Sequence, residues 1–132
     1  MISELMRDKA SPQVLEWIDG HPSDDLYISA VNRGEIERGL NLMPRGKRRL
    51  ARELVAEGIF ETFRGRCLAF EEAAAIVFGY VASSRIRSGR PISTEDAQIA
   101  AIALVHGMKV ATRNTSDFAD IDGLVTIDPW KS

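Results

Sequence analysis

The helix-like stretch between residues 93 and 106 constrains the fold of this chain more than any other segment. It begins at Ser93, a residue type that caps helix N-termini, and Gly107 follows its last turn. From Ala97 to Val105 every residue except Gln98 is apolar, so such a helix has almost no polar face to present to water. A helix of this kind has to be covered on several sides, which predicts that it packs against a sheet.

Strand-like and helix-like runs alternate along the rest of the chain. We predict strands at 25–29, 66–70, 109–112 and 124–127, and helices at 11–20, 31–42, 47–63, 71–88 and 93–106. This alternation predicts an α/β fold with a mainly parallel central sheet flanked by helices. The chain has 132 residues, which is the size of one domain, so we expect residues 1–132 to form a single domain.

The charge balance bears on nucleic-acid binding. The net charge is -2 and the isoelectric point is about 5.7, so the chain as a whole has no attraction for a polyanion. A nucleic-acid site would have to be a local basic patch, and the candidates are Arg33, Arg38, Arg45, Lys47 and Arg48. A solvated helix face explains the same residues, whereas the functional interpretation is contact with phosphate or with an acidic partner.

Cysteine and hydropathy bear on the compartment. Cys67 is the single cysteine, which excludes an intrachain disulfide and is typical of a reducing compartment. It lies in the apolar run 66–70, so we expect a buried and unreactive thiol. No apolar run is long enough to span a bilayer and no signal peptide opens the sequence, so a cytoplasmic location without a membrane is the default expectation.

Three acids lie where the ligands of an α/β sheet usually bind, beyond the carboxyl ends of the strands. Glu35 is one turn into the helix after strand 25–29, Asp96 is at a helix N-terminus, and Asp117 follows strand 109–112. Mg²⁺ and Mn²⁺ prefer carboxylate and water oxygens as ligands. The three acids therefore predict a metal site suited to phosphodiester hydrolysis, in which the metal activates a water.

Each of these acids also has a purely structural interpretation. Asp96, with its neighbour Glu95, would favour the dipole of a helix that it merely caps. Glu35 would be a solvated charge in a polar turn, and Asp117 would form a local turn. From spacing alone the structural and the catalytic interpretation both stay open.

At this point the sequence resembles a known family, the PIN-domain ribonucleases, and within it the VapC- and FitB-like toxins of bacterial toxin–antitoxin pairs, often called plasmid stability proteins. The resemblance covers essentially the whole chain, and the motifs occur in the family's order. The residues that carry it are Ile-Ser-Glu-Leu-Met-Arg at 2–7, Tyr-Ile-Ser-Ala-Val at 27–31 with Glu35 and Arg38-Gly39, Asp96-Ala-Gln-Ile-Ala-Ala101, Ala111-Thr-Arg-Asn114 with Asp117-Phe118, and Asp128-Pro-Trp130.

The resemblance implies a three-layer PIN-like fold and a divalent-metal-dependent endoribonuclease that uses Mg²⁺ or Mn²⁺. It also implies a homodimer held inactive by a cognate antitoxin of a type II system. Carried over residue by residue, Glu35, Asp96 and Asp117 match the family's second, third and fourth acidic positions. The supporting residues are Thr112 and Asn114, which match polar positions flanking the site, and Glu4, which matches an acid just after the first motif.

The N-terminus departs from the family pattern. The family begins with a hydrophobic strand that runs into Leu-Asp-Thr-Asn, and Met1 stands where that pattern continues with Val. We therefore expect a PIN-like domain without its first central strand and first catalytic Asp, through either a misassigned start or decay of the gene. This expectation raises an alternative function: an inactive PIN-domain remnant that binds an antitoxin or a full-length toxin.

Overall fold

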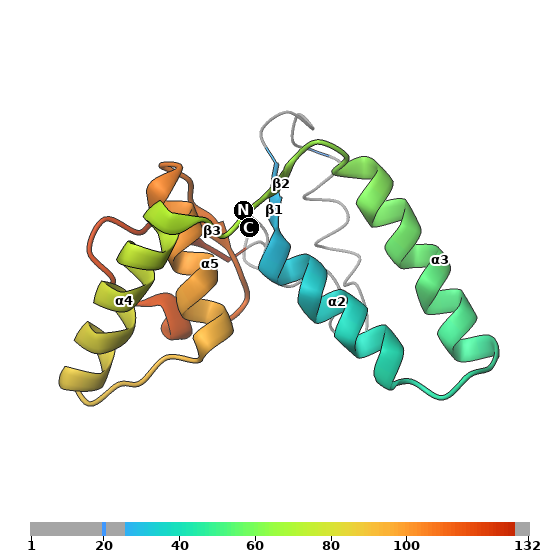
Figure 1. Cartoon of the computed structure of the whole chain (residues 1–132), viewed down its shortest axis with the longest axis horizontal. Coiled ribbons are helices and arrows are strands. Elements are labelled where there is room, and N and C mark those ends of the chain that lie inside the picture. Colours follow the sequence, from blue (N-terminus) through green and yellow to red (C-terminus); the bar gives the residue numbers. More distant parts are fainter. Residues whose placement is uncertain (1–19, 21–25, 129–132) are drawn as a thin grey trace.

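Four helices make up most of the part of the chain that the structure, a computed structural model, describes: residue 20 and residues 26–128 (Figure 1). They are α2 (Ala30–Leu42), α3 (Lys47–Thr62), α4 (Glu72–Arg87) and α5 (Thr94–Val105). The helix predicted at 11–20, apart from Gly20, lies outside the described residues, as do Glu4 and the motif at 2–7. The other four predicted helices are confirmed, and each end lies within one residue of the prediction.

The start of α5 was predictable because a serine caps it. The Ser93 side chain accepts a hydrogen bond from the Asp96 backbone N–H at 3.1 Å, at the start of α5. The other end of α5 is closed by Gly107, whose φ of +64° is in the left-handed region that favours glycine. Both signals are local, so the sequence alone reveals them.

The strands are short and parallel. They are β1 (Ile28–Ser29), β2 (Cys67–Leu68), β3 (Val110–Ala111) and β4 (Thr126–Ile127). β1 pairs with β2 and β3 pairs with β4, so the described residues form two two-stranded sheets, where we predicted one central sheet. The α/β class with parallel pairing is confirmed.

The predicted strands were too long because the backbone hydrogen bonding between paired strands ends after a few residues. Around β3, the backbone N–H groups of Val110 and Thr112 donate to the carbonyls of Val125 and Ile127, at 3.0 and 2.8 Å. Directly after Thr112 the chain turns into η2 (Thr115–Phe118), a single 3₁₀ turn that the sequence did not predict. An apolar run sets the maximum length of a strand, and the turn after it sets the actual length.

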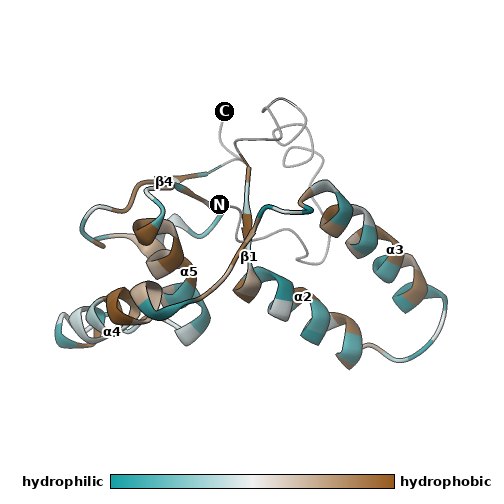
Figure 2. Ribbon diagram, turned by 45° about the horizontal axis from the view of Figure 1, so that its top comes forward, coloured by the Kyte–Doolittle hydropathy of each residue, from teal (hydrophilic) through white to brown (hydrophobic). Residues whose placement is uncertain are grey.

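The largest core surrounds α5. Ala97 and the five residues from Ile99 to Ala103 are at most 1% exposed, which confirms the prediction of a buried helix. α4 packs along one side of α5, and Val110 of β3 and Phe118 of η2 close the core on others. Figure 2 shows α5 coloured as hydrophobic, whereas α2 and α3 alternate between hydrophobic and hydrophilic turns.

Two smaller cores hold the other half of the described chain. Leu26, Ile28 and Phe63 cluster with Ala111, so a β3 side chain packs with β1 although no ladder joins these two strands in the described part of the chain. The other core lies between α2 and α3, around Ile36. In Figure 1, α4 and α5 consequently lie at one end of the molecule and α2 and α3 at the other, with β1 and β2 between them.

None of the helices within the described ranges is both long and apolar enough to cross a membrane.

The burial of α5 predicts a large effect of truncating one of its side chains. Ile102→Ala leaves a cavity in the main core, so we expect the free energy of unfolding to fall by about 2–5 kcal/mol in urea titrations. Leu42→Ala at the end of α2 is the matched control, because Leu42 is 73% exposed and its loss should cost less than about 0.5 kcal/mol. Equal losses in the two variants would contradict the core described above.

Candidate functional site

A buried capping box fixes the start of α2, the helix that carries Glu35. The Ser29 hydroxyl accepts a hydrogen bond from the Asn32 backbone N–H at 3.1 Å, and the Asn32 side-chain oxygen accepts from the Ser29 backbone N–H at 2.9 Å. A third bond runs from the Ser29 hydroxyl to the same Asn32 oxygen, at 2.9 Å. Both residues are buried, so the first turn of α2 is held rigidly against β1. Sequence analysis missed this pair, although a Ser followed three residues later by Asn is a recognisable cap.

The three predicted acids lie on three elements, one of which contacts the other two. Glu35 is exposed on α2, one turn after the capping box; Asp96 is half-buried in the first turn of α5; and Asp117 is exposed in η2. α5 packs against both α2 and η2. The fold thus brings together the segments that carry the acids.

Thr112 and Asn114 shape the loop that leads to Asp117. Thr112 is buried, and its hydroxyl accepts a hydrogen bond from the Asn114 backbone N–H at 3.1 Å. The Asp117 backbone N–H then donates to the Asn114 carbonyl at 3.0 Å. These two polar residues, which were predicted to support the site, thus connect β3 to the turn that carries the acid.

A buried arginine that the sequence analysis missed also holds this loop. Arg85 of α4 is 7% exposed, and its guanidinium donates to the backbone carbonyls of Asp117 and Ala119 at 3.0 and 3.1 Å. A signal for it exists in the sequence. Arg85 lies four residues after the buried Val81, so it continues the apolar stripe of α4 where a solvated cation is not expected.

The residue types of the site fit a hard divalent cation, because carboxylate oxygens are the ligands that Mg²⁺ and Mn²⁺ prefer. Within residues 26–128, however, no group of three or more His, Cys, Asp or Glu side chains is placed so that it could hold a metal ion. That Glu35, Asp96 and Asp117 share one ion therefore stays a prediction. Glu4, the further supporting acid, is outside the described residues.

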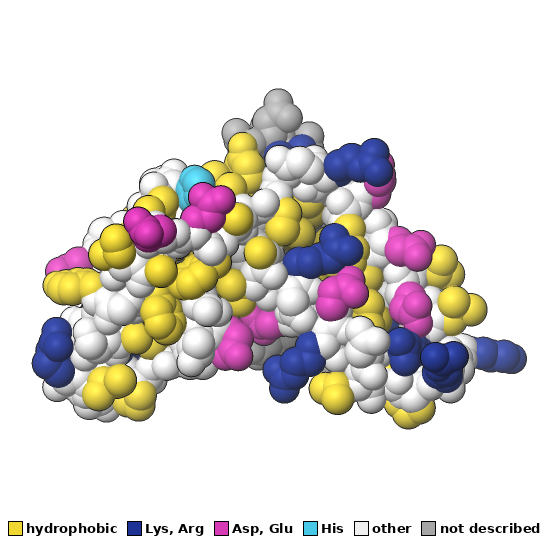
Figure 3. All heavy atoms as spheres, in the orientation of Figure 1, with side chains coloured by type: hydrophobic (Ala, Val, Ile, Leu, Met, Phe, Trp, Pro, Cys, Tyr) yellow, Lys and Arg dark blue, Asp and Glu magenta, His cyan; other side chains and the backbone are white. Residues whose placement is uncertain are grey.

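Most of the predicted basic residues gather at one end of the molecule. Arg38, Arg45, Lys47 and Arg48 are exposed, near the end of α2, in the turn that follows it and at the start of α3. Figure 3 shows Lys and Arg side chains over this end. Arg33 differs, because its guanidinium lies 3.5 Å from the centre of the Phe60 ring and pairs with Glu37 at 3.3 Å. Arg33 therefore has a structural role in joining α2 to α3.

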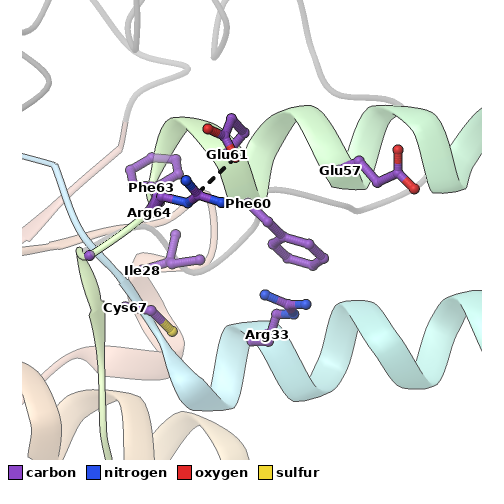
Figure 4. Close-up of a pocket in the computed structure, with 9 residues that line it drawn as sticks. Ile28, Arg33, Glu57, Phe60, Glu61, Phe63, Arg64 and Cys67 are labelled. Carbon is purple, nitrogen blue, oxygen red and sulfur yellow. Dashed lines mark ion pairs between the residues drawn. The ribbon is translucent and has the colours of Figure 1, made fainter.

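A pocket of about 500 Å³ lies between α2, α3 and β2 (Figure 4). Arg33, Phe60 and Phe63 line it, and so does Cys67. The prediction of a buried Cys67 was wrong: the side chain is exposed, because β2 is only two residues long and leaves the thiol at the pocket wall. Partial desolvation raises the pKa of Cys67, and the nearby charge of Arg33 lowers it by less. The thiol is therefore protonated at neutral pH, in line with the expected low reactivity.

Comparison with known proteins relates this arrangement to a family. Residues 1–124 match the model of the PIN domain. The VapC ribonuclease Y4jK of Sinorhizobium fredii is 39% identical, and the alignment covers 99% of this chain and 94% of that protein. The toxin FitB of Neisseria gonorrhoeae is 33% identical over 98% of this chain and 94% of FitB.

Solved structures agree with the sequence comparison. The structure of FitAcB from Neisseria gonorrhoeae superposes with a TM-score of 0.85 at 31% identity and covers 100% of both chains. A DNA-bound VapBC structure from Salmonella typhimurium has a TM-score of 0.76 at 26% identity, over 89% of this chain and 85% of that one. By its sequence and its fold alike, the chain belongs to the PIN-domain family.

Proposed function

We propose that this protein is a divalent-metal-dependent endoribonuclease, the toxin component of a type II toxin–antitoxin system. The observation that carries the proposal is the position of Glu35, Asp96 and Asp117 on α2, α5 and η2, where α5 packs against the other two, in a chain similar along its length to a VapC ribonuclease. Carboxylates on neighbouring segments suit a hydrolase that cleaves a phosphodiester bond with a bound cation.

In this proposal the acids hold the metal, and the neighbouring polar residues position the segments that carry the acids. Glu35, Asp96 and Asp117 would hold Mg²⁺ or Mn²⁺, which when bound activates a water and stabilises the charge on the leaving oxygen. The capping box of Ser29 and Asn32 holds the first turn of α2, and Glu35 lies in the next turn. Thr112 and Asn114 set the course of the chain toward Asp117.

The substrate in this proposal is RNA, with contacts from Arg38, Arg45, Lys47 and Arg48. Exposed cations attract phosphates over distances of about 10 Å at moderate salt, which suits a chain with no overall positive charge. The proposed regulator is a cognate antitoxin, because the similar FitAB and VapBC structures are of toxin–antitoxin complexes. RNA and antitoxin of this kind are cytoplasmic, so we place the protein there.

The proposed quaternary state is a homodimer formed through α4. Ile76 and Tyr80 are 70% and 62% exposed, and four residues separate them, so they lie on one side of α4. Ile86 adds a third large apolar side chain, at 65% exposure. Exposed apolar surface of this kind on one helix is typical of an interface between subunits.

A second candidate function is an inactive PIN domain that binds an antitoxin or a toxin. The observation that favours it is the lack, within residues 26–128, of a group of three acids, histidines or cysteines that could hold a metal. The two functions differ in whether RNA is cleaved when Mg²⁺ or Mn²⁺ is added.

Removal of one carboxylate should distinguish the ribonuclease from the inactive binding protein. Asp96→Asn keeps the size of the side chain but removes its charge, so we expect cleavage of single-stranded RNA in Mn²⁺ to fall by about 100-fold. Asp122→Asn is the matched control, because Asp122 is exposed in the turn before β4 and should leave the rate unchanged. Metal-dependent cleavage that survives in Asp96→Asn would remove Asp96 from the site, and no cleavage in the unmodified protein would favour the second function.

If the basic residues contact RNA, their removal should reduce the salt dependence of RNA binding. The triple variant of Arg45→Ala, Lys47→Ala and Arg48→Ala removes three cations, each of which contributes about 0.7 to the slope of log affinity against log salt on single-stranded RNA. We expect the slope to fall by about 2 in fluorescence anisotropy titrations. Arg87→Ala, an exposed cation on α4, is the control and should change it little. An unchanged slope in the triple variant would assign these residues to a solvated surface.

A charge on α4 should break the proposed dimer. Tyr80→Glu places a carboxylate beside Ile76 on the apolar surface, so light scattering after size-exclusion chromatography should show a monomer in place of a dimer at micromolar concentration. Leu42→Glu, at a similarly exposed position at the end of α2, should leave the dimer intact. A monomeric unmodified protein, or a dimer that tolerates Tyr80→Glu, would contradict the proposed interface.

A further inference from the structure

The guanidinium of Arg85 joins two segments that are far apart in the sequence. Its Nε donates to the carbonyl of Arg90 at 2.7 Å, and its Nη1 donates to the carbonyls of Asp117 and Ala119 at 3.0 and 3.1 Å. All its hydrogen bonds within the described residues run to backbone carbonyls. Arg85 thus connects the end of α4 and the turn that follows it to the two residues on either side of Phe118.

The segment around Asp117 has little regular structure of its own to hold it. η2 is one turn long, and at its two ends the Asp117 N–H donates to the Asn114 carbonyl and the Ala119 N–H donates to the Ser116 carbonyl. Asp120 follows with a φ of +59°, a strained conformation for a residue other than glycine. A loop of this kind keeps one shape only if the surrounding structure imposes it.

Two side chains besides Arg85 contribute to that constraint. Phe118 is 2% exposed and inserts into the main core beside α5. Arg90 pairs with the Asp120 carboxylate from outside and donates to the Ser116 carbonyl at 3.5 Å. Arg85 differs from Arg90 in being buried, so its bonds are shielded from water, whereas the pair of Arg90 and Asp120 is screened.

We propose that Arg85 is a positioning residue for the Asp117 carboxylate, acting through the two backbone carbonyls that flank Phe118. The proposal rests on the proposed function, in which Asp117 is a metal ligand. The Asp117 side chain is exposed and its carbonyl accepts from Arg85, so this backbone bond, together with the burial of Phe118, restricts where the carboxylate can move. Metal ligands lose affinity when the groups that orient them are removed.

The planar guanidinium explains why the residue is an arginine. Nε and Nη1 point in different directions from one rigid group, so one side chain reaches Arg90 and the loop at the same time. A lysine ammonium is a compact charge on a flexible stem and does not keep this geometry. Arg85→Lys therefore retains the positive charge and removes the two differently oriented donors of the guanidinium.

The experiment compares Arg85→Lys and Arg85→Met with Arg87→Met, an exposed arginine two residues further along α4. The first measurement is hydrogen exchange by mass spectrometry on the full-length protein. In both Arg85 variants we expect the amides of residues 114–120 to exchange at least about tenfold faster, and the amides of α2 to exchange as in the unmodified protein. Arg87→Met should change neither segment.

The second measurement is the affinity for Mn²⁺ by calorimetry, with Asp117→Asn as the reference variant. We expect Arg85→Lys to weaken Mn²⁺ binding by about 10-fold, in the direction of Asp117→Asn, while Arg87→Met has no effect. A residue with a merely structural role would accelerate exchange throughout the protein without this selective loss of metal affinity.

Three outcomes would overturn the positioning role: unchanged exchange at 114–120, exchange that rises equally in α2, or unchanged Mn²⁺ affinity in Arg85→Lys although Asp117→Asn weakens it. A different result identifies a failure of the proposed function. If Asp117→Asn binds Mn²⁺ as well as the unmodified protein, Asp117 is not a ligand, and the proposal for Arg85 falls with the metal site.

Discussion

The burial of the middle of α5 is the constraint on which the rest of the structure depends. Its buried alanines and isoleucines share one core with side chains of α4, β3 and η2. A helix enclosed in this way has no freedom to rotate or shift, because any movement would open cavities in a close-packed core. Asp96 lies in the first turn of this fixed helix, so its position is set by the core.

Polar groups inside the protein extend this rigidity to the loops. Ser29 and Asn32 satisfy the backbone at the start of α2, Thr112 satisfies the backbone after β3, and Arg85 satisfies two carbonyls beside Phe118. Each of these side chains is almost fully buried, where an unsatisfied backbone group would cost about 1–3 kcal/mol. The apolar core thus fixes the helices, and buried hydrogen bonds fix the segments on which Glu35 and Asp117 lie.

The parts of this arrangement that were predictable are the local ones. Helix ends follow from caps such as Ser93 and from Gly107, and the enclosure of α5 follows from its apolar composition. Strand length was overestimated because it depends on where the chain turns away from its partner strand, as it does after Thr112. Cys67 is exposed for the same reason, because the pairing of its strand is equally short.

The role of Arg85 escaped prediction for a related reason. The loop that it holds is more than thirty residues further along the chain. Its place on the apolar stripe of α4 was a sign of burial, but the sequence does not name the carbonyls that it meets. Whether the three acids share one ion is likewise a question of tertiary distance, and spacing along the chain does not answer it.

The most direct test of the account is a crystal of the protein soaked in Mn²⁺ and measured at an X-ray energy where manganese scatters anomalously. The account predicts one anomalous peak among the carboxylates of Glu35, Asp96 and Asp117, with metal–oxygen distances of about 2.0–2.2 Å to at least one of them and waters bridging to the others. A peak elsewhere in the molecule, or the three carboxylates on separate surfaces with no metal between them, would contradict it.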